Sequence, residues 1–235
     1  MKRGILQACG FPIGLPAISL SENFVEPTTM IYRNLLAMEA EELLRSRRVD
    51  GVVLMGGCDK ATPGLLLGAI SMNLPAIHLP PGPMLRGNGQ GRVLGRARTP
   101  GNTWTSSGRV SSRTRIGSGS RWHRALLRHL HDHGHASTMT AIAEALGMSL
   151  SGASSISAPN SGHIRMATAC GRPVVEMVWE DLTPCRVQTL PAFENAITVA
   201  TAMGCSTNAI IHPMAMARRA GAKLLTGLRL DVQPH

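Results

Sequence analysis

The residues of this chain that are best suited to chemistry stand side by side in the tetrad Gly57-Cys58-Asp59-Lys60. The tetrad places a thiol, a carboxylate and an amine on consecutive positions. It joins an apolar run at 52–55 to a helix-like segment that begins at Pro63. In an open α/β sheet, ligands bind at the turn that follows the carboxyl end of a strand. The tetrad is therefore a candidate functional site.

Each of the three side chains also has a purely structural interpretation. Cys58 alone would more often be a small buried hydrophobe. Asp59 could be the N-cap of the following helix, and Lys60 could be a solvated charge. Few structural requirements call for all three residue types in a row, so we favour the chemical interpretation.

The segments around the tetrad predict a β-α-β unit. Residues 52–55 favour a buried parallel strand, residues 63–72 a helix, and residues 74–79 the next strand. Two neighbouring parallel strands need a crossover connection of this kind. The expected fold class is α/β, with a parallel sheet flanked by helices and the tetrad on the first crossover.

Apolar spacing and capping residues predict the other elements. Residues 1–30 are typical of loops and short extended pieces, and residues 173–178 favour a strand. Helices are expected from about Thr28-Thr29 and over 138–146, 161–170, 192–203 and 207–220. Expected helix ends are Gly147, Gly171 and Gly221, and Ser206 is an expected cap. Two apolar helix faces are expected: one carries Met30, Ile31, Leu35, Met38 and Leu43, and the other carries Phe193, Ile197 and Val199.

The net charge of +10 comes mostly from one stretch. Between Arg86 and His135 there are ten arginines, no lysine and one acid. A basic stretch can bind nucleic acid, so a nucleic-acid-binding protein that uses residues 86–135 is an alternative function. Against it, the stretch has no periodic helix or recognition motif, and aromatic residues make up only 3% of the chain. The simplest structural interpretation is a basic linker without a core.

The five cysteines are widely spaced and form no CxxC pair. This is not a disulfide framework, so we expect a reducing cytoplasm. The first residues only faintly resemble a signal peptide, and no apolar run approaches the roughly 20 residues that span a bilayer. We expect no membrane partner. Cys9, Cys170, Cys185 and Cys205 are expected to be core or surface thiols, and His78, His163 and His212 structural or surface residues.

Several long motifs together resemble one enzyme family. They lie at 10–12, 32–38, 50–60, 74–77, 82–87, 136–139, 176–184, 193–197 and 206–209. They include Tyr32-Arg33-Asn34, Gly82-Pro83-Met84 and Ala136-Ser137-Thr138-Met139. The sequence resembles the dehydratases that include dihydroxy-acid dehydratase, phosphogluconate dehydratase and the aldonic (sugar) acid dehydratases. Residues 10–12 and 32–38 look most like the sugar-acid branch.

The resemblance implies a reaction and a role for each tetrad side chain. The family removes water from a 2,3-dihydroxy acid to give a 2-keto-3-deoxy acid, with an iron–sulfur cluster beside Mg²⁺. By resemblance, Cys58 would ligate cluster iron as a thiolate. Asp59 would ligate Mg²⁺, and Lys60 would be carbamylated to give a second oxygen ligand. The resemblance also implies a small acid as substrate and a homo-oligomer.

The chain departs from the family pattern just before residue 136. The family has a cluster cysteine there, in a Cys-x-Thr-Met-Gly-like motif, whereas this chain has the histidine-rich run 129–135. The run resembles a metal-binding tract, so a zinc protein is a third candidate function. We favour a frameshift over 96–135, because possible codons for 129–135, read one base later, encode a family-like cysteine motif. A shifted GC-rich gene also explains the excess of arginine over lysine.

These departures indicate how the chain is organised and whether it is active. We expect a first part of the dehydratase N-terminal domain at 1–95, an aberrant and poorly ordered stretch at 96–135, a second part at 136–222, and a divergent tail at 223–235. By resemblance, an upstream cluster cysteine, an upstream Mg²⁺ aspartate and a C-terminal domain are also missing. One thiolate rarely holds a cluster, so the chain alone is expected to be an inactive fragment.

Overall fold

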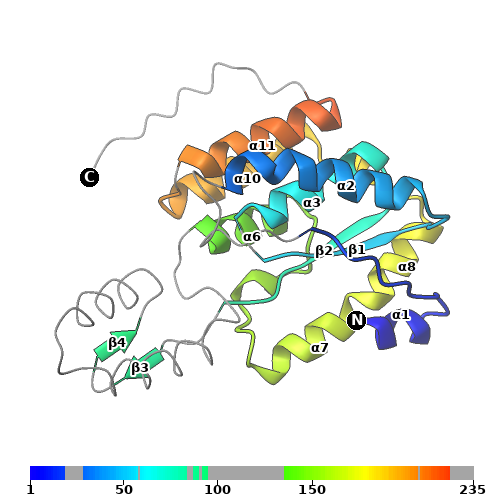
Figure 1. The fold of residues 1–235 in the computed structure, drawn as a ribbon, viewed down its shortest axis with the longest axis horizontal. Coiled ribbons are helices and arrows are strands. Elements are labelled where there is room, and N and C mark those ends of the chain that lie inside the picture. Colours follow the sequence, from blue (N-terminus) through cyan, green and yellow to red (C-terminus); the bar gives the residue numbers. More distant parts are fainter. Residues whose placement is uncertain are drawn as a thin grey trace, which may run out of the picture.

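A small parallel sheet between two layers of helices organises the computed structural model of the chain (Figure 1). The structure describes residues 1–18, 29–57, 59–83, 87–89, 92–94, 135–205 and 207–222. Strand β1 (Val52–Met55) pairs in parallel with β2 (Ala76–Leu79), with Val52 opposite Ala76 and Met55 opposite Leu79. Helix α3 (Ala61–Met72) connects the two strands. This confirms the predicted β-α-β unit and the α/β class.

One helical layer lies on the α3 side of the sheet. It contains α2 (Arg33–Arg45), α6 (His135–Ala145), α10 (Leu190–Ala202) and α11 (Thr207–Ala220). Helix α3 is buried nearly all round because α2 and α11 both pack on it. The larger core of the protein lies here, with Leu66, Ile142, Phe193 and Met216 all fully buried.

The opposite face of the sheet is covered by α1 (Lys2–Gln7), α7 (Ser161–Ala169) and α8 (Gly171–Trp179). A second core lies there, built around Ile77, Leu79, Met166 and Val174. The remaining elements are the 3₁₀ turns η1 (Thr29–Tyr32) and η2 (Ala153–Ser155), helix α9 (Pro184–Val187), and an antiparallel pair, β3 (Gly87–Gly89) with β4 (Arg92–Leu94). No described helix is long and apolar enough to cross a membrane.

Two predictions of local structure were wrong. Residues 173–178 form part of helix α8 rather than a strand. Val174 and Val178, four residues apart, both lie against Gly51 at the sheet, and Arg172 pairs with Glu176 on the outer side. Pro173 is tolerated because it stands in the first turn, where its missing N–H has no helical partner. Residues 2–7, expected to be loop, form α1.

Gly171 does not end helix α7 but opens α8 at a close helix contact. A Cβ added to Gly171 would lie 2.3 Å from the backbone nitrogen of Ile5 in α1. Gly147 and Gly221 do follow helices and have φ angles of +76°, as expected of left-handed helix ends. The expected cap Ser206 and nearly all of the Arg-rich stretch 96–135 lie outside the described residues.

The apolar face expected on α2 was also wrong. Ile31, Leu35 and Met38 are exposed, and the helix instead buries Leu36, Ala37, Ala40 and Leu44 against α3. Small residues allow this close contact, since a Cβ on Gly68 would lie 2.8 Å from that of Ala40. On α10, Phe193 and Ile197 are buried as predicted, but Val199 is exposed.

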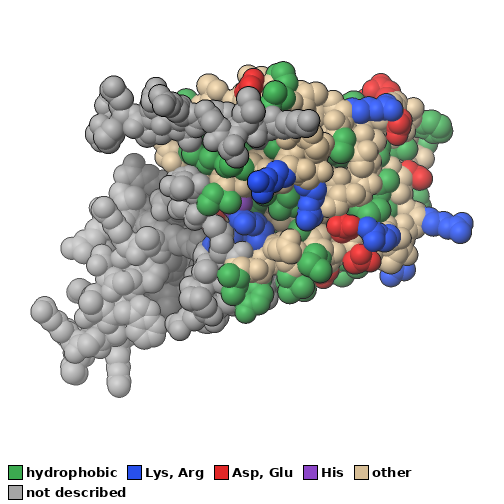
Figure 2. All heavy atoms as spheres, turned by 90° about the horizontal axis from the view of Figure 1, so that it is seen from above, with side chains coloured by type: hydrophobic (Ala, Val, Ile, Leu, Met, Phe, Trp, Pro, Cys, Tyr) green, Lys and Arg blue, Asp and Glu red, His purple; other side chains and the backbone are tan. Residues whose placement is uncertain are grey.

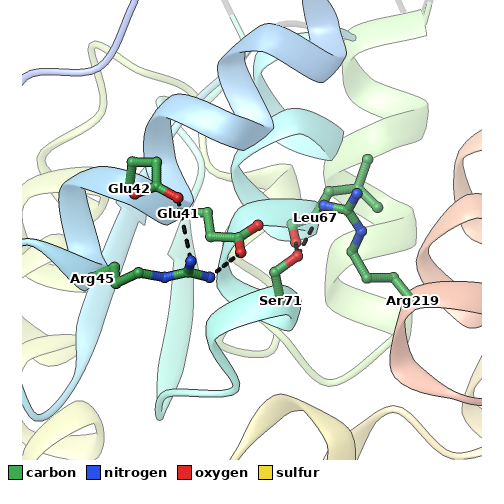
Figure 3. A network of polar contacts seen from close by, with 6 residues as sticks. All are labelled: Glu41, Glu42, Arg45, Leu67, Ser71 and Arg219. Atoms are coloured by element: carbon green, nitrogen blue, oxygen red, sulfur yellow. Dashed lines mark hydrogen bonds and ion pairs between the residues drawn. The ribbon is translucent and has the colours of Figure 1, made fainter.

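Polar contacts lie near the C-terminal ends of α2, α3 and α11 (Figure 3). Arg45 of α2 pairs with Glu41 at 2.5 Å and with Glu42 at 3.4 Å. Ser71 of α3 donates to the carbonyl of Leu67 and accepts from Arg219 of α11 at 2.9 Å. The Arg219–Ser71 contact ties α11 to α3.

Candidate active site in the turn after β1

Gly57, Asp59 and Lys60 of the tetrad lie in the turn that joins β1 to α3, at the carboxyl end of the strand. β1 ends at Met55, and Lys60 is the N-cap of α3. This is where the sequence predicted it, on the first crossover of a β-α-β unit. Cys58 lies outside the described residues, so its predicted role as an iron ligand stays a prediction.

The start of the turn is fixed by hydrogen bonds to the carbonyl of Gly56. Nε2 of His78 lies 2.9 Å from this oxygen, and the hydroxyl of Thr62 donates to it at 3.4 Å. His78 and Thr62 are both fully buried. Because a carbonyl only accepts, Nε2 of His78 carries the hydrogen and Nδ1 is bare.

Burial lowers the pKa of His78 to about 4, although its bond to Gly56 acts in the opposite direction. His78 is thus neutral at physiological pH, in agreement with its predicted structural role. It also holds residues 148–149 in place: its backbone N–H donates to the carbonyl of Met148, and its backbone carbonyl accepts from the hydroxyl of Ser149.

The middle of the turn is packed against the loop that follows β2. A Cβ added to Gly57 would lie 1.9 Å from Cγ of Pro81, so only glycine fits there. The loop is held in turn, because Nε2 of His163 lies 2.9 Å from the carbonyl of Pro80 and the N–H of Ala158 donates to the carbonyl of Pro83. The two strand ends therefore form one supported edge, as the predicted topology requires.

Asp59 and Lys60 form an ion pair within the turn. Nζ of Lys60 lies 3.3 Å from Oδ2 of Asp59, and the side chains are 13% and 21% exposed, respectively. The ends of these two side chains are thus close enough to contact the same small ligand. Both side chains are thus sheltered but not fully buried.

A contact between two side chains of other elements lies beside this pair and was missed by sequence reasoning. Arg33, the first residue of α2, places a guanidinium nitrogen within hydrogen-bond distance of both ring nitrogens of His212, 2.9 Å from Nε2. His212 lies in α11 and is only 2% exposed. Burial lowers the pKa of Arg33, and the negative charge of Asp59 opposes that change. The available signal was the Tyr32-Arg33-Asn34 motif, which the resemblance had already singled out.

Two described side chains of the turn match metal ligands that the resemblance implied. Asp59 offers a carboxylate and Lys60, once carbamylated, would offer a second, which fits Mg²⁺ because this ion prefers oxygen ligands. Nevertheless, the described part of the chain contains no group of three or more His, Cys, Asp or Glu that could hold a metal ion. Any further ligands must come from outside these residues.

The four described cysteines do not complete a cluster site. Cys170 is buried in the second core, 3.9 Å from the sulfur of Met166, and burial raises its pKa to about 11. Burial also raises the pKa of Cys205, while Cys9 and Cys185 are exposed. These positions confirm the expectation of core and surface thiols. The described residues therefore do not fit an iron–sulfur cluster by themselves.

Comparison with known proteins gives the relationship of the chain. A family model described as "Dihydroxy-acid/6-phosphogluconate dehydratase N-terminal" matches residues 1–231. The chain is 50% identical to 6-deoxy-6-sulfo-D-gluconate dehydratase of Pseudomonas putida and 42% identical to L-arabinonate dehydratase of Rhizobium leguminosarum bv. trifolii. Each alignment covers 95% of this chain and 39% of the relative.

A more distant relative points the same way. A dihydroxy-acid dehydratase of Halothermothrix orenii is 31% identical over the whole chain and 44% of its own length. The chain thus spans about two fifths of the length of the curated relatives that it matches. It belongs to the family of dihydroxy-acid and 6-phosphogluconate dehydratases, which are hydro-lyases, and corresponds to their N-terminal domain.

Proposed function

We propose that this chain carries the Mg²⁺-binding part of a hydro-lyase that converts a 2,3-dihydroxy sugar acid to a 2-keto-3-deoxy acid. The single observation that supports it most is the sheltered Asp59–Lys60 pair at the carboxyl end of β1, 3.3 Å apart. The relatives favour a sugar acid, since two of those named above are dehydratases of 6-deoxy-6-sulfo-D-gluconate and L-arabinonate.

In this proposal Asp59 and a carbamylated Lys60 hold Mg²⁺. When bound, Mg²⁺ would supply positive charge at the substrate's oxygens, and a cluster would supply a Lewis acid at the 3-hydroxyl. The chain's own contribution is positioning. His78 and Thr62 fix the Gly56 carbonyl, Gly57 packs on Pro81, and so the two ligands are presented at a defined edge of the sheet.

We further propose that the chain by itself is inactive, because its described residues lack a cluster site and a full metal ligand set. Cys58 remains the proposed iron ligand of the tetrad. The proposal includes a cytoplasmic location, as is common for a reduced-cysteine metabolic enzyme.

A chimera tests the function of the turn. Residues 50–83 of this chain would replace the matching segment of the L-arabinonate dehydratase of Rhizobium leguminosarum bv. trifolii, and 2-keto acid formation from L-arabinonate would be followed as the semicarbazone. We expect an active chimera, with activity lost on Asp59→Asn or Lys60→Met. An active Asp59→Asn chimera would contradict the proposal.

The matched control is Thr62→Ser in the same chimera, which keeps the hydroxyl that bonds Gly56 and should keep activity. The unmodified chain, incubated with iron, sulfide, Mg²⁺ and bicarbonate, should show neither cluster absorbance nor dehydration of L-arabinonate. Turnover by the unmodified chain would overturn the proposal of inactivity.

A further inference from the structure

Arg33 and His212 are brought to the turn from distant parts of the sequence, and the proposed function gives them no role. Arg33 opens α2, and its carbonyl would lie 3.3 Å from a Cβ added to Gly64 of α3. The N–H of Gly64 donates to the carbonyl of Lys60 at 3.1 Å. The first residue of α2 therefore lies over the first turn of α3, next to Asp59 and Lys60.

His212 fixes the direction of the Arg33 side chain. It is 2% exposed, and its ring nitrogens lie against one guanidinium nitrogen of Arg33. Because arginine only donates hydrogen bonds, the imidazole is the acceptor. Helix α11 also packs on α3, so the support for Arg33 belongs to the same rigid layer as the turn.

The charges beside the turn change once Lys60 is carbamylated. The ammonium of Lys60 then becomes an anion, whereas Arg33, which begins α2 over the first turn of α3, keeps a positive charge near Asp59. An arginine stays charged at neutral pH, and its planar fork matches a carboxylate. Figure 2 shows the face that carries α2 and α11, on which Lys and Arg side chains lie among hydrophobic and acidic ones.

We propose that Arg33 binds the carboxylate of the sugar-acid substrate and that His212 is the positioning residue that holds Arg33 toward the metal turn. The inference rests on the proposed function, because it needs an acid substrate at Asp59 and Lys60. It adds a specificity determinant, since a neutral sugar has no carboxylate for Arg33 to bind.

The test measures the affinity of the full chain for sodium gluconate and, in a separate experiment, for Mn²⁺. Both are measured by calorimetric titration in bicarbonate buffer. Arg33→Met should weaken gluconate binding about 10- to 100-fold, the usual range for losing a charged hydrogen-bonding partner. Mn²⁺ affinity should not fall. Arg33→Lys keeps the charge but loses the planar fork, so its gluconate affinity should lie between those of the wild type and Arg33→Met. Arg172→Met, which removes an exposed guanidinium from α8, should leave both affinities unchanged.

His212 is tested by rescue. His212→Phe removes the acceptor and should weaken gluconate binding, whereas His212→Gln restores an acceptor oxygen and should recover most of the affinity. Equal effects of the two substitutions would assign His212 a packing role and contradict its part in the proposal. Far-ultraviolet circular dichroism reports whether each variant is folded.

The outcomes separate the inference from the proposed function. Undiminished gluconate binding by Arg33→Met and Arg33→Lys overturns the inference, as does a chain that binds Mn²⁺ but not gluconate. If both Arg33 variants lose Mn²⁺ binding as well as gluconate binding, the role of Arg33 is structural, and this result also overturns the inference. An unmodified chain that binds gluconate but no Mn²⁺ contradicts the proposed function instead.

Discussion

The buried histidine beneath the turn should make the stability of this protein fall in mild acid. His78 is fully buried, donates to the carbonyl of Gly56, and has a pKa of about 4 against an ordinary value of 6.5. As the pH falls, the unfolded chain takes up this proton before the folded one. The stabilising contribution is therefore fully present above pH 6.5 and is lost between pH 6.5 and about 4.

The size of the effect follows from the two pKa values. Lowering the pKa from 6.5 to about 4 corresponds to about 3 kcal/mol of unfolding free energy. For a domain of ordinary stability this is a large fraction of the total, so the acid limb of the stability curve should be steep.

Urea unfolding followed by circular dichroism, at about pH 7 and about pH 4, measures the effect. Other groups titrate in this range, so the informative quantity is the difference between the wild type and His78→Gln, which can donate to Gly56 but does not ionise. The wild type should lose about 3 kcal/mol more than His78→Gln on acidification. Thr62→Val is the matched control: it removes the other bond to Gly56 but carries no titrating group, so its pH dependence should match the wild type.

Equal losses in the wild type and His78→Gln would refute the reasoning, since His78 would then be able to accept a proton in the folded state. A Thr62→Val variant with a flattened pH dependence would also contradict it, because the acid sensitivity would then come from the turn as a whole and not from His78.

Three further predictions follow from other parts of the molecule. Gly57→Ala should destabilise the chain by about 1–3 kcal/mol in urea unfolding, because its Cβ would lie 1.9 Å from Pro81, while Gly14→Ala, where the nearest atom is 3.7 Å away, should be nearly neutral; equal effects would show that the contact is not tight. Glu144→Gln should cost about 1–2 kcal/mol, since Glu144 accepts from Ser154 and Gly152. Burial raises the pKa of Glu144, but the bonds from Ser154 and Gly152 lower it overall. The difference in unfolding free energy between the wild type and Glu144→Gln should therefore shrink as the pH falls through the lowered pKa. A difference that stays constant with pH would argue against these bonds. Sequencing the coding region around codons 95 and 136 should reveal small deletions whose repair restores a cysteine motif before Ala136; if no single-base repair does so, the frameshift is wrong.

The position of the candidate site could be predicted from sequence because it depends on short-range patterns. An apolar run, a turn and a helix predict the β-α-β unit, and the unit alone places Asp59 and Lys60 at the carboxyl end of β1. The long apolar helix α3 was equally clear, since a helix covered by α2 and α11 needs no polar face.

What failed depended on contacts between distant segments. Residues 173–178 carry β-branched side chains that suit a strand, but Val174 and Val178 meet Gly51 at helical spacing. The apolar periodicity of α2 indicated the wrong face, because Gly64 and Gly68 of α3 accept the smaller face of α2 so closely that Leu35 and Met38 are left outside. The Arg33–His212 contact joins residues 179 positions apart, and no local pattern can reveal such a pair.

Binding of Mn²⁺ at the turn tests the central claim most directly. Mn²⁺ prefers oxygen ligands as Mg²⁺ does, and its electron paramagnetic resonance signal reports binding without any turnover. With bicarbonate present, the wild-type chain should bind one Mn²⁺. Asp59→Asn and Lys60→Met should each abolish binding, and Asp181→Asn, which alters an exposed carboxylate paired with Arg186, should not. If Asp59→Asn and Lys60→Met bind Mn²⁺ as the wild type does, or if the wild type binds none, the turn after β1 is not the metal site.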